Sequence, residues 1–257
     1  MPNSAVWQRE VTLPIGYLDE ASGMLHRQVT LRKMTGKEEA LLAEPSLRSN
    51  GGKLISALLA NCVTHIEAMA QVEPEVMRRM FSGDRNFLLL ELRRLTFGDE
   101  MEATYRCPHC QGVTTLLENL STIPVRVVED EGIPVIAVTL TDGYRDLDDN
   151  WQYELVFGLP TGEDEEVASG RRDSNPTRQR DALLARCLKQ VGNLDQRRIQ
   201  AMGIRILSDL SMPDRRQIQK AVDATTPGPD LTRQVNCDRC GEQYLTTLDM
   251  SHFFSTA

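Results

Sequence analysis

Cys107-Pro-His-Cys110 and Cys237-Asp-Arg-Cys240 are two copies of one short pattern, a pair of cysteines separated by two residues. Polar or small turn-forming residues follow each pair at once, namely Gln111-Gly112 and Gly241. This is the build of a zinc knuckle, a tight turn in which two thiolates reach one ion. Two knuckles complete a tetrahedral site, which leaves no open position for catalysis. The predicted ligands of one structural Zn²⁺ are Cys107, Cys110, Cys237 and Cys240.

The two knuckles lie far apart in the chain, because 237 − 110 − 1 = 126 residues separate them. A compact zinc ribbon has only roughly 15–20 residues at this place. A duplicated unit explains the separation, since each copy would bring its own knuckle to a shared site. Metal binding of roughly 10–16 kcal/mol would then clamp one copy to the other.

Further sequence matches occur in the same order in both halves, with offsets of 127, 126, 125 and 130 residues. The matching pairs are Val11–Tyr17 with Val138–Tyr144, Thr35 with Thr161, Ala57–Cys62 with Ala182–Cys187, and Asp84–Cys110 with Asp214–Cys240. A series of this kind indicates internal duplication. We predict a first unit over residues 10–124, a linker over 125–136 and a second unit over 137–254. The two units are predicted to be related by a pseudo-twofold axis.

Each unit is predicted to have an α+β fold. Alternating apolar residues predict a β-hairpin at the start of each unit. Thr35 with Glu38 forms a capping box that begins a helix, and Thr161 repeats the cap before the acidic residues 163–166. Apolar residues at helical spacing predict further helices. Strands over 101–106 and 113–117 then place the first knuckle at the tip of a second hairpin, and the second copy repeats this arrangement.

The other cysteines and the histidine of the first knuckle are interpreted as structural. Cys62 and Cys187 fall on the apolar faces of two matching helices, so we expect both thiols to be buried. His109 could replace a cysteine as a ligand, but its counterpart in the second knuckle is Arg239. We therefore interpret His109 as a turn residue that faces solvent.

Two other uses of the C-x-x-C pairs remain open. A redox dithiol is one, although neither pair has the strand-to-helix context of a thioredoxin motif. Pairing of knuckles from different subunits is the other. Both compete with the single structural site within one chain.

Composition excludes several classes of function. A net charge of −8 and an aromatic content of 5% argue against a nucleic-acid surface, which needs clustered cations and stacking platforms. No apolar run approaches the roughly 18 residues of a membrane span. The first residues lack the pattern of a signal peptide, so we expect a reducing cytosol, where cysteines stay thiols. Common catalytic motifs are absent from the sequence, and we expect no enzymatic activity.

Two stretches carry a resemblance to a known family. Residues 82–99, SGDRNFLLLELRRLTFGD, run into a strand and the first knuckle, and residues 23–39 read G-x-x-H-R-x-V-x-L-R-x-M-T-G-x-E-E. This sequence resembles baseplate and tail-assembly proteins of contractile-tailed phages and phage-like contractile injection systems, of the T-even baseplate hub type. The resemblance covers about residues 10–125, and the second half matches mainly through its knuckle.

The resemblance implies a non-enzymatic structural or assembly protein of a phage-like tail baseplate. Its partners would be other baseplate and tail proteins in an oligomeric assembly. It would be made in the cytoplasm of a bacterial host and assembled into a virion tail or phage-like particle. The alternatives are a tail-assembly chaperone absent from the finished particle, a zinc-ribbon regulator associated with nucleic acid, and an enzyme with an unrecognised site. The resemblance does not extend to the metal, which depends on the cysteine spacing alone.

Overall fold

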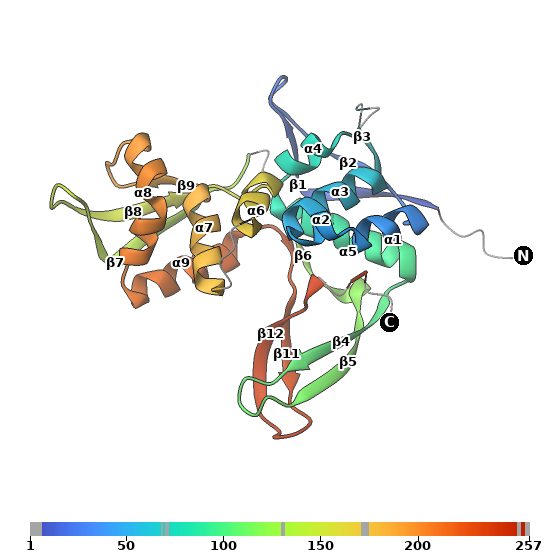
Figure 1. Ribbon diagram of the computed structural model, residues 1–257. Helices are drawn as coiled ribbons and strands as arrows, with labels where there is room; N and C mark the ends of the chain where they lie inside the picture. Colours follow the sequence, from blue (N-terminus) through green and yellow to red (C-terminus); the bar gives the residue numbers. More distant parts are fainter. Residues whose placement is uncertain are drawn as a thin grey trace, which may run out of the picture.

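The computed structural model describes residues 7–67, 69, 72–129, 132–170, 175–250 and 253–254. Two lobes of small antiparallel sheets and helices lie side by side, and two long hairpins project together from one side of them (Figure 1). The predicted α+β class is confirmed. No helix in the described ranges is long and apolar enough to cross a membrane.

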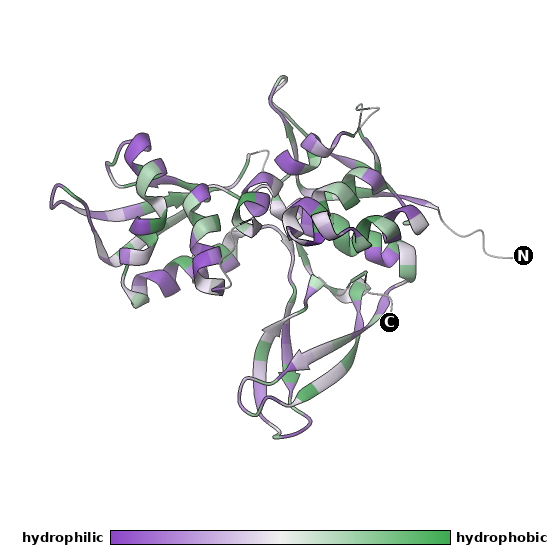
Figure 2. Cartoon of the chain, viewed as in Figure 1, coloured by the Kyte–Doolittle hydropathy of each residue, from purple (hydrophilic) through white to green (hydrophobic). Residues whose placement is uncertain are grey.

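The first lobe consists of one three-stranded sheet and the helices packed on it. Its strands are β1 (Gln8–Asp19), β2 (Met24–Arg32) and β3 (Val63–Ile66), in the order β1-β2-β3. Its helices are α1 (Gly36–Ala43), α2 (Pro45–Arg48), α3 (Gly51–Cys62), α4 (Pro74–Arg79) and α5 (Ser82–Phe97). Apolar residues of α3 and α5 form the middle of the lobe together with the inward face of the sheet (Figure 2). Burial of these side chains is the main stabilising contribution to the lobe.

The second lobe has the same sheet order and begins its helices in the same way. Its strands are β7 (Ile136–Arg145), β8 (Trp151–Phe157) and β9 (Leu188–Val191), in the order β7-β8-β9. Its helices are α6 (Gly162–Ser169), α7 (Pro176–Cys187), α8 (Gln196–Asp209) and α9 (Met212–Thr225). Capping boxes begin α1 at Thr35 with Glu38 and α6 at Thr161 with Asp164, as the sequence predicts.

One buried carboxylate in each lobe binds the irregular part of the first strand. The β1–β2 register shifts between Thr12 and Tyr17, and there the Asp84 carboxylate accepts the N–H groups of Ile15 at 2.8 Å and Gly16 at 2.9 Å. Asp84 is 0% exposed, and burial raises its pKa to about 6 although the two N–H donors act in the opposite direction. A bulge frees backbone N–H groups from the sheet, so a buried acceptor is needed there.

The same arrangement occurs in the second lobe. The β7–β8 register shifts between Thr139 and Tyr144, and Asp214 accepts the N–H groups of Thr141 at 2.6 Å and Gly143 at 3.1 Å. Asp214 is also 0% exposed. Both carboxylates therefore join the last long helix of a lobe to its first strand.

The projecting hairpins form a third packed group of side chains. They are β4 (Glu100–Arg106) with β5 (Val113–Asn119), and β11 (Thr232–Asn236) with β12 (Gln243–Thr247). Their shared core includes Tyr105, Val235, Leu248 and Phe253. Because this core takes residues from both halves, neither hairpin buries its apolar face alone.

The stretch 125–136, predicted as a linker, begins with a short strand pairing. After the 3₁₀ turn η1 (Leu120–Thr122), β6 (Val125–Arg126) pairs with β10 (Gly228–Pro229). The first residues of this stretch thus bond to the second half of the chain. Residues 130–131 of the stretch lie outside the described residues.

The lobes meet through unlike surfaces, because the first turn of α6 inserts against α3, α4 and α5 (Figure 1). Gly162 donates its N–H to the Met80 carbonyl at 3.0 Å, and Ser82 donates to the Pro160 carbonyl at 2.8 Å. A Cβ at Gly162 would lie 2.4 Å from Nη1 of Arg85, so only glycine fits there.

Ion pairs accompany this backbone contact. The fully buried Arg85 pairs with Glu165 at 3.1 Å, and Arg78 pairs with Glu166 at 3.1 Å. Glu166 also accepts a hydrogen bond from the Ser56 hydroxyl at 2.6 Å. The acidic run that begins α6 therefore also holds the two lobes together.

We expect Asp84→Ala to lower the free energy of unfolding by roughly 3 kcal/mol or more, because two buried N–H groups would lose their acceptor. Urea denaturation followed by circular dichroism measures the change. Asp209→Ala is the control, since within the described part of the chain Asp209 has one exposed ion pair, with Arg205, and its loss should change the value by less than about 0.5 kcal/mol. Equal effects of the two substitutions would contradict this role of Asp84.

Candidate metal centre

The two knuckles meet at the tips of the projecting hairpins. Their four Sγ atoms all lie within 4.8 Å of one another. The contacts between the hairpins are Cys107 Sγ to Cys240 Sγ at 3.8 Å and Cys110 Sγ to Cys237 Sγ at 3.5 Å. Each sulfur therefore has a close neighbour from the other half of the chain.

The donor set fits a tetrahedral metal. Four sulfurs at about 2.3 Å from a Zn²⁺ ion would lie about 3.8 Å from one another, which is close to the 3.8 and 3.5 Å separations between the hairpins. All four cysteines are free thiols. Cys107 and Cys237 are buried, whereas Cys240 is exposed, so the ion would be held at the surface of the hairpin tips.

Each knuckle is shaped by the same pair of backbone hydrogen bonds. In the first, Gln111 donates to the Cys107 carbonyl at 3.0 Å and Cys107 donates to the Gly112 carbonyl at 2.9 Å. In the second, Gly241 donates to the Cys237 carbonyl and Cys237 donates to the Glu242 carbonyl, both at 2.9 Å. The N–H of Gly112 also points to Cys110 Sγ at 3.3 Å, the N–H to thiolate contact expected of a knuckle.

The pKa values of two of the thiols, Cys237 and Cys240, are shifted in opposite directions. Backbone N–H groups of Cys240 and Arg239 lower the pKa of Cys237 to about 6. The N–H of Glu242 lowers the pKa of Cys240, but loss of hydration and hydrogen bonding among the four sulfurs outweigh it and raise that pKa to about 12. The crowded sulfurs thus resist simultaneous ionisation, which a bound cation would relieve.

Side chains from both hairpins support the site. The buried Thr114 hydroxyl accepts the N–H of Asp238 at 3.1 Å. Glu118 of β5 pairs with Arg233 of β11 at 2.9 Å and accepts a hydrogen bond from the Tyr105 hydroxyl at 2.6 Å. The two contacts between the hairpins, Glu118 with Arg233 and Thr114 with Asp238, leave no motif in the sequence, because their partners lie 115 and 124 residues apart.

The knuckles also interlock sterically. A Cβ at Gly112 would lie 2.9 Å from the Cβ of Arg239 and 3.1 Å from Cys110 Sγ. Residue 112 must therefore be small for the second knuckle to approach the first.

Comparison with protein families identifies the class of the chain. A family model described as T4 bacteriophage base plate protein matches residues 8–255. The chain belongs to this family. The predicted resemblance to baseplate proteins is confirmed, and the match extends over both halves rather than mainly the first. Comparisons with curated proteins and with solved structures gave no significant match.

Other residues of this baseplate protein are placed as the sequence predicts. His109 is exposed at the tip of its turn. Cys62 and Cys187 are buried, 0% and 4% exposed, in the cores of the two lobes. Burial raises the pKa of each of these two thiols to about 12, so both are poor nucleophiles and poor ligands.

Alkylation with iodoacetamide should distinguish the two groups of cysteines. In folded, chelator-treated protein we expect modification at Cys110 and Cys240, the two knuckle cysteines that reach the surface. Cys62 and Cys187 should react only after denaturation, because they are 0% and 4% exposed in the cores of the lobes and the reagent cannot reach them. Peptide mass spectrometry measures each site. Modification of Cys62 or Cys187 in the folded protein at a comparable rate would contradict their burial.

Proposed function

We propose that the chain is a non-enzymatic structural or assembly protein of a contractile phage-like tail baseplate, stabilised by one structural Zn²⁺ on four cysteines. The family match over residues 8–255 carries this proposal, because it covers both lobes and both hairpins. A structural role in the tail baseplate is what membership of this family supports. The zinc is supported by the convergence of the four sulfurs.

The proposed ligands are Cys107, Cys110, Cys237 and Cys240. The bound ion would supply charge compensation and a crosslink between the two hairpins. Four thiolates would fill its coordination shell, so it would offer neither a Lewis-acid position nor an activated water. This supports a role in shaping the protein rather than in catalysis.

We further propose that the chain arose by tandem duplication, with units over 10–124 and 137–254 and a linker over 125–136. The common sheet order, the two capping boxes and the two buried carboxylates support it. Arg85 bonds to the Met77 carbonyl, and Arg215 bonds to the Leu207 carbonyl at the corresponding place. Two tandem copies of one ancestral unit would produce each of these features once in each half of the chain.

A pseudo-twofold relation is proposed for the hairpins. Exchanging the two knuckles turns the Cys107–Cys240 contact into the Cys237–Cys110 contact, and the two distances are similar, 3.8 and 3.5 Å. We restrict the proposed axis to the hairpins, because among the described residues α6 packs on α3, α4 and α5 whereas α1 makes no comparably extensive contact with a helix of the second lobe. Their junction is therefore of the head-to-tail kind.

The proposed partners are other baseplate and tail proteins, reached after synthesis in a bacterial host. The net charge of −8 continues to count against the nucleic-acid alternative. The chaperone alternative differs only in whether the chain stays in the finished particle.

We expect purified protein to contain about one zinc per chain, and Cys107→Ser and Cys240→Ser each to lose it. Either loss should increase hydrogen exchange in both hairpins, because the crosslink joins them. Elemental analysis and hydrogen-exchange mass spectrometry make the measurement, with Cys62→Ala as a control that keeps its zinc. Folded, reduced protein without zinc would refute the site. Zinc bound only by dimers without a folded monomer would indicate knuckles from different subunits.

The baseplate role predicts that particles fail to assemble when the gene is deleted. Complementation with the wild-type gene should restore particle yield, and mass spectrometry of purified particles should detect the chain. Restored assembly with the chain missing from the particle would indicate the chaperone. Normal particle yield without the gene would contradict both roles.

A further inference from the structure

A large groove lies between the two lobes, beside the base of the second hairpin. Its walls come from α5 of the first lobe, from α7 and α9 of the second lobe, and from the segment 226–232 that leads into β11 (Figure 1). The groove has a volume of about 970 Å³. This is at the upper end of the roughly 300–1,000 Å³ that ligand sites occupy, so the groove has room for a segment of another chain.

The α9 wall of the groove differs from its counterpart in the first lobe. In α5, Leu89 and Leu90 are 2% and 1% exposed, and Leu90 packs in the core shared by the hairpins. Gln219 and Lys220 stand at the corresponding positions of α9, 130 residues later. The second hairpin packs on the first one instead of on this face of α9, and Lys220 is exposed. A buried apolar face in one unit is thus a polar, basic face in the other.

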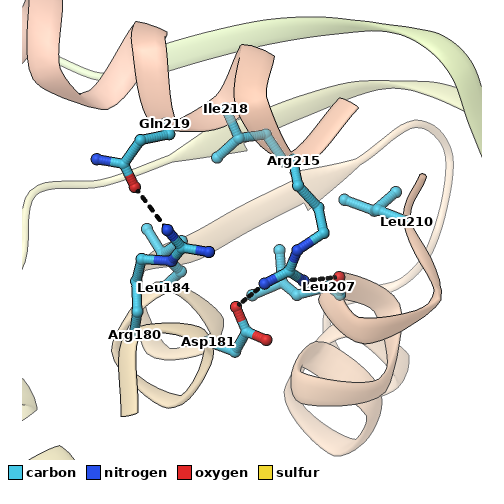
Figure 3. A pocket seen from close by; sticks show the side chains of 8 residues that line it. All are labelled: Arg180, Asp181, Leu184, Leu207, Leu210, Arg215, Ile218 and Gln219. Atoms are coloured by element: carbon cyan, nitrogen blue, oxygen red, sulfur yellow. Dashed lines mark hydrogen bonds and ion pairs between the residues drawn. The ribbon is translucent and has the colours of Figure 1, made fainter. Parts of the chain in front are cut away.

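Three cations line the groove without a carboxylate partner. Arg216 and Lys220 lie one turn apart on the same face of α9, and both are exposed. Within the described ranges, neither side chain bonds to another protein group. Figure 3 shows Arg180 reaching from α7 to the neutral side-chain oxygen of Gln219, at 3.2 Å, which is its one bond in the described part of the chain.

The neighbouring guanidinium of Arg215 is different, because Asp181 pairs with it at 2.7 Å (Figure 3). Arg215 is therefore neutralised within the lobe and does not line the large groove. The three unpaired cations stand out in a chain with 37 acidic and 29 basic residues, since acidic partners are in excess.

Acidic residues in the groove already have other partners. They are Glu165, Asp223 and Asp230. Glu165 pairs with the buried Arg85 at 3.1 Å. Asp223 accepts a hydrogen bond from the Gln219 side chain at 2.7 Å, and Asp230 accepts a backbone N–H at 3.0 Å. Among the described residues, none of the three forms an ion pair with the three cations. The cations are therefore available to the negative groups of another molecule.

The opposite wall carries polar groups with unused hydrogen-bonding capacity. Ser82 of α5 is 7% exposed, and its hydroxyl has no hydrogen-bond partner among the described residues. Asn86 lies one turn later on the same helix, and its side-chain amide makes no hydrogen bond within the described ranges. Both residues line the groove. Buried polar groups without a partner are uncommon in native structures, and the backbone of a bound segment would supply the missing partner.

The surface between these walls is apolar. Leu183 and Leu184 of α7 line it together with Val222 and Leu231, and all four are half-buried. Phe157 also lines the groove but is 0% exposed, so its ring is not available for base stacking. Aliphatic side chains beside cations suit a polypeptide that alternates carboxylates with aliphatic residues, and they suit a nucleic acid poorly.

We propose that this groove binds an acidic segment of a partner protein, whose carboxylates pair with Arg180, Arg216 and Lys220. Aliphatic side chains of the segment pack on the leucines of α7, and its backbone bonds to Ser82 and Asn86. This deepens the proposed function, because it names the chemistry of one contact between the chain and its partners. The source of the segment rests on that function, whereas the binding itself does not.

The test begins with selection from a randomised library of short peptides on the immobilised, zinc-loaded full chain. Recovered peptides should be rich in Asp and Glu interleaved with Leu, Ile and Val. Fluorescence anisotropy then measures the Kd of labelled peptides. A variant with both Arg216→Glu and Lys220→Glu should weaken their binding at least roughly tenfold, because two attractive charge contacts become repulsive.

A variant with both Lys53→Glu and Arg197→Glu is the matched control. Both side chains are exposed on helices outside the groove, and the net charge changes by the same amount. This control should bind the peptides like the wild-type chain. A milder variant with both Arg216→Gln and Lys220→Gln should weaken binding severalfold, and it replaces the first variant if circular dichroism shows that the first does not fold.

Recovery of peptides without acidic enrichment would overturn the proposal. So would acidic peptides whose binding is unchanged in the groove variants, or reduced equally in the control. A polyuridylate oligonucleotide that displaces the peptides and binds more tightly would overturn it as well, since the occupant would then be a nucleic acid. Zinc content and particle assembly are measured separately, so their failure would contradict the proposed function without changing the result for the groove.

Discussion

The meeting of four cysteine sulfurs at the tips of two hairpins is the constraint on which the rest of the structure depends. The knuckles are separated by 126 residues, so the whole second lobe must fold in a way that returns β11 and β12 beside β4 and β5. The shared hairpin core and the Glu118–Arg233 ion pair assist this return. The proposed zinc would fix it, because four thiolates gain their full coordination only when both hairpins are in place.

Two kinds of contact thus join the halves of the chain, and they differ in symmetry. The two knuckles contact each other as equivalent partners. All four sulfurs are therefore used within the chain, and none is left for another molecule. The lobes pair unlike surfaces through Arg85, Glu165 and the backbone around Gly162.

Features set by neighbouring residues could be predicted from the sequence. The capping boxes at Thr35 and Thr161, the hairpins and the burial of Cys62 follow from local pattern, and the spacing of the knuckles indicated that they act together. Contacts between distant segments could not be predicted. A helix start is enough to explain the acidic residues 163–166. Nothing in the sequence therefore pointed to their ion pairs with the first lobe. The β6–β10 pairing is too short to leave a periodic signal.

X-ray absorption spectroscopy at the zinc edge of the purified monomer tests the central claim most directly, because it counts and identifies the atoms bound to the metal. Four cysteines predict four sulfur ligands at about 2.3 Å and no nitrogen or oxygen ligand in the first shell. Two sulfurs with nitrogen or oxygen ligands would contradict the account. That result would mean that each knuckle binds its metal alone and that the two halves are not joined through one ion.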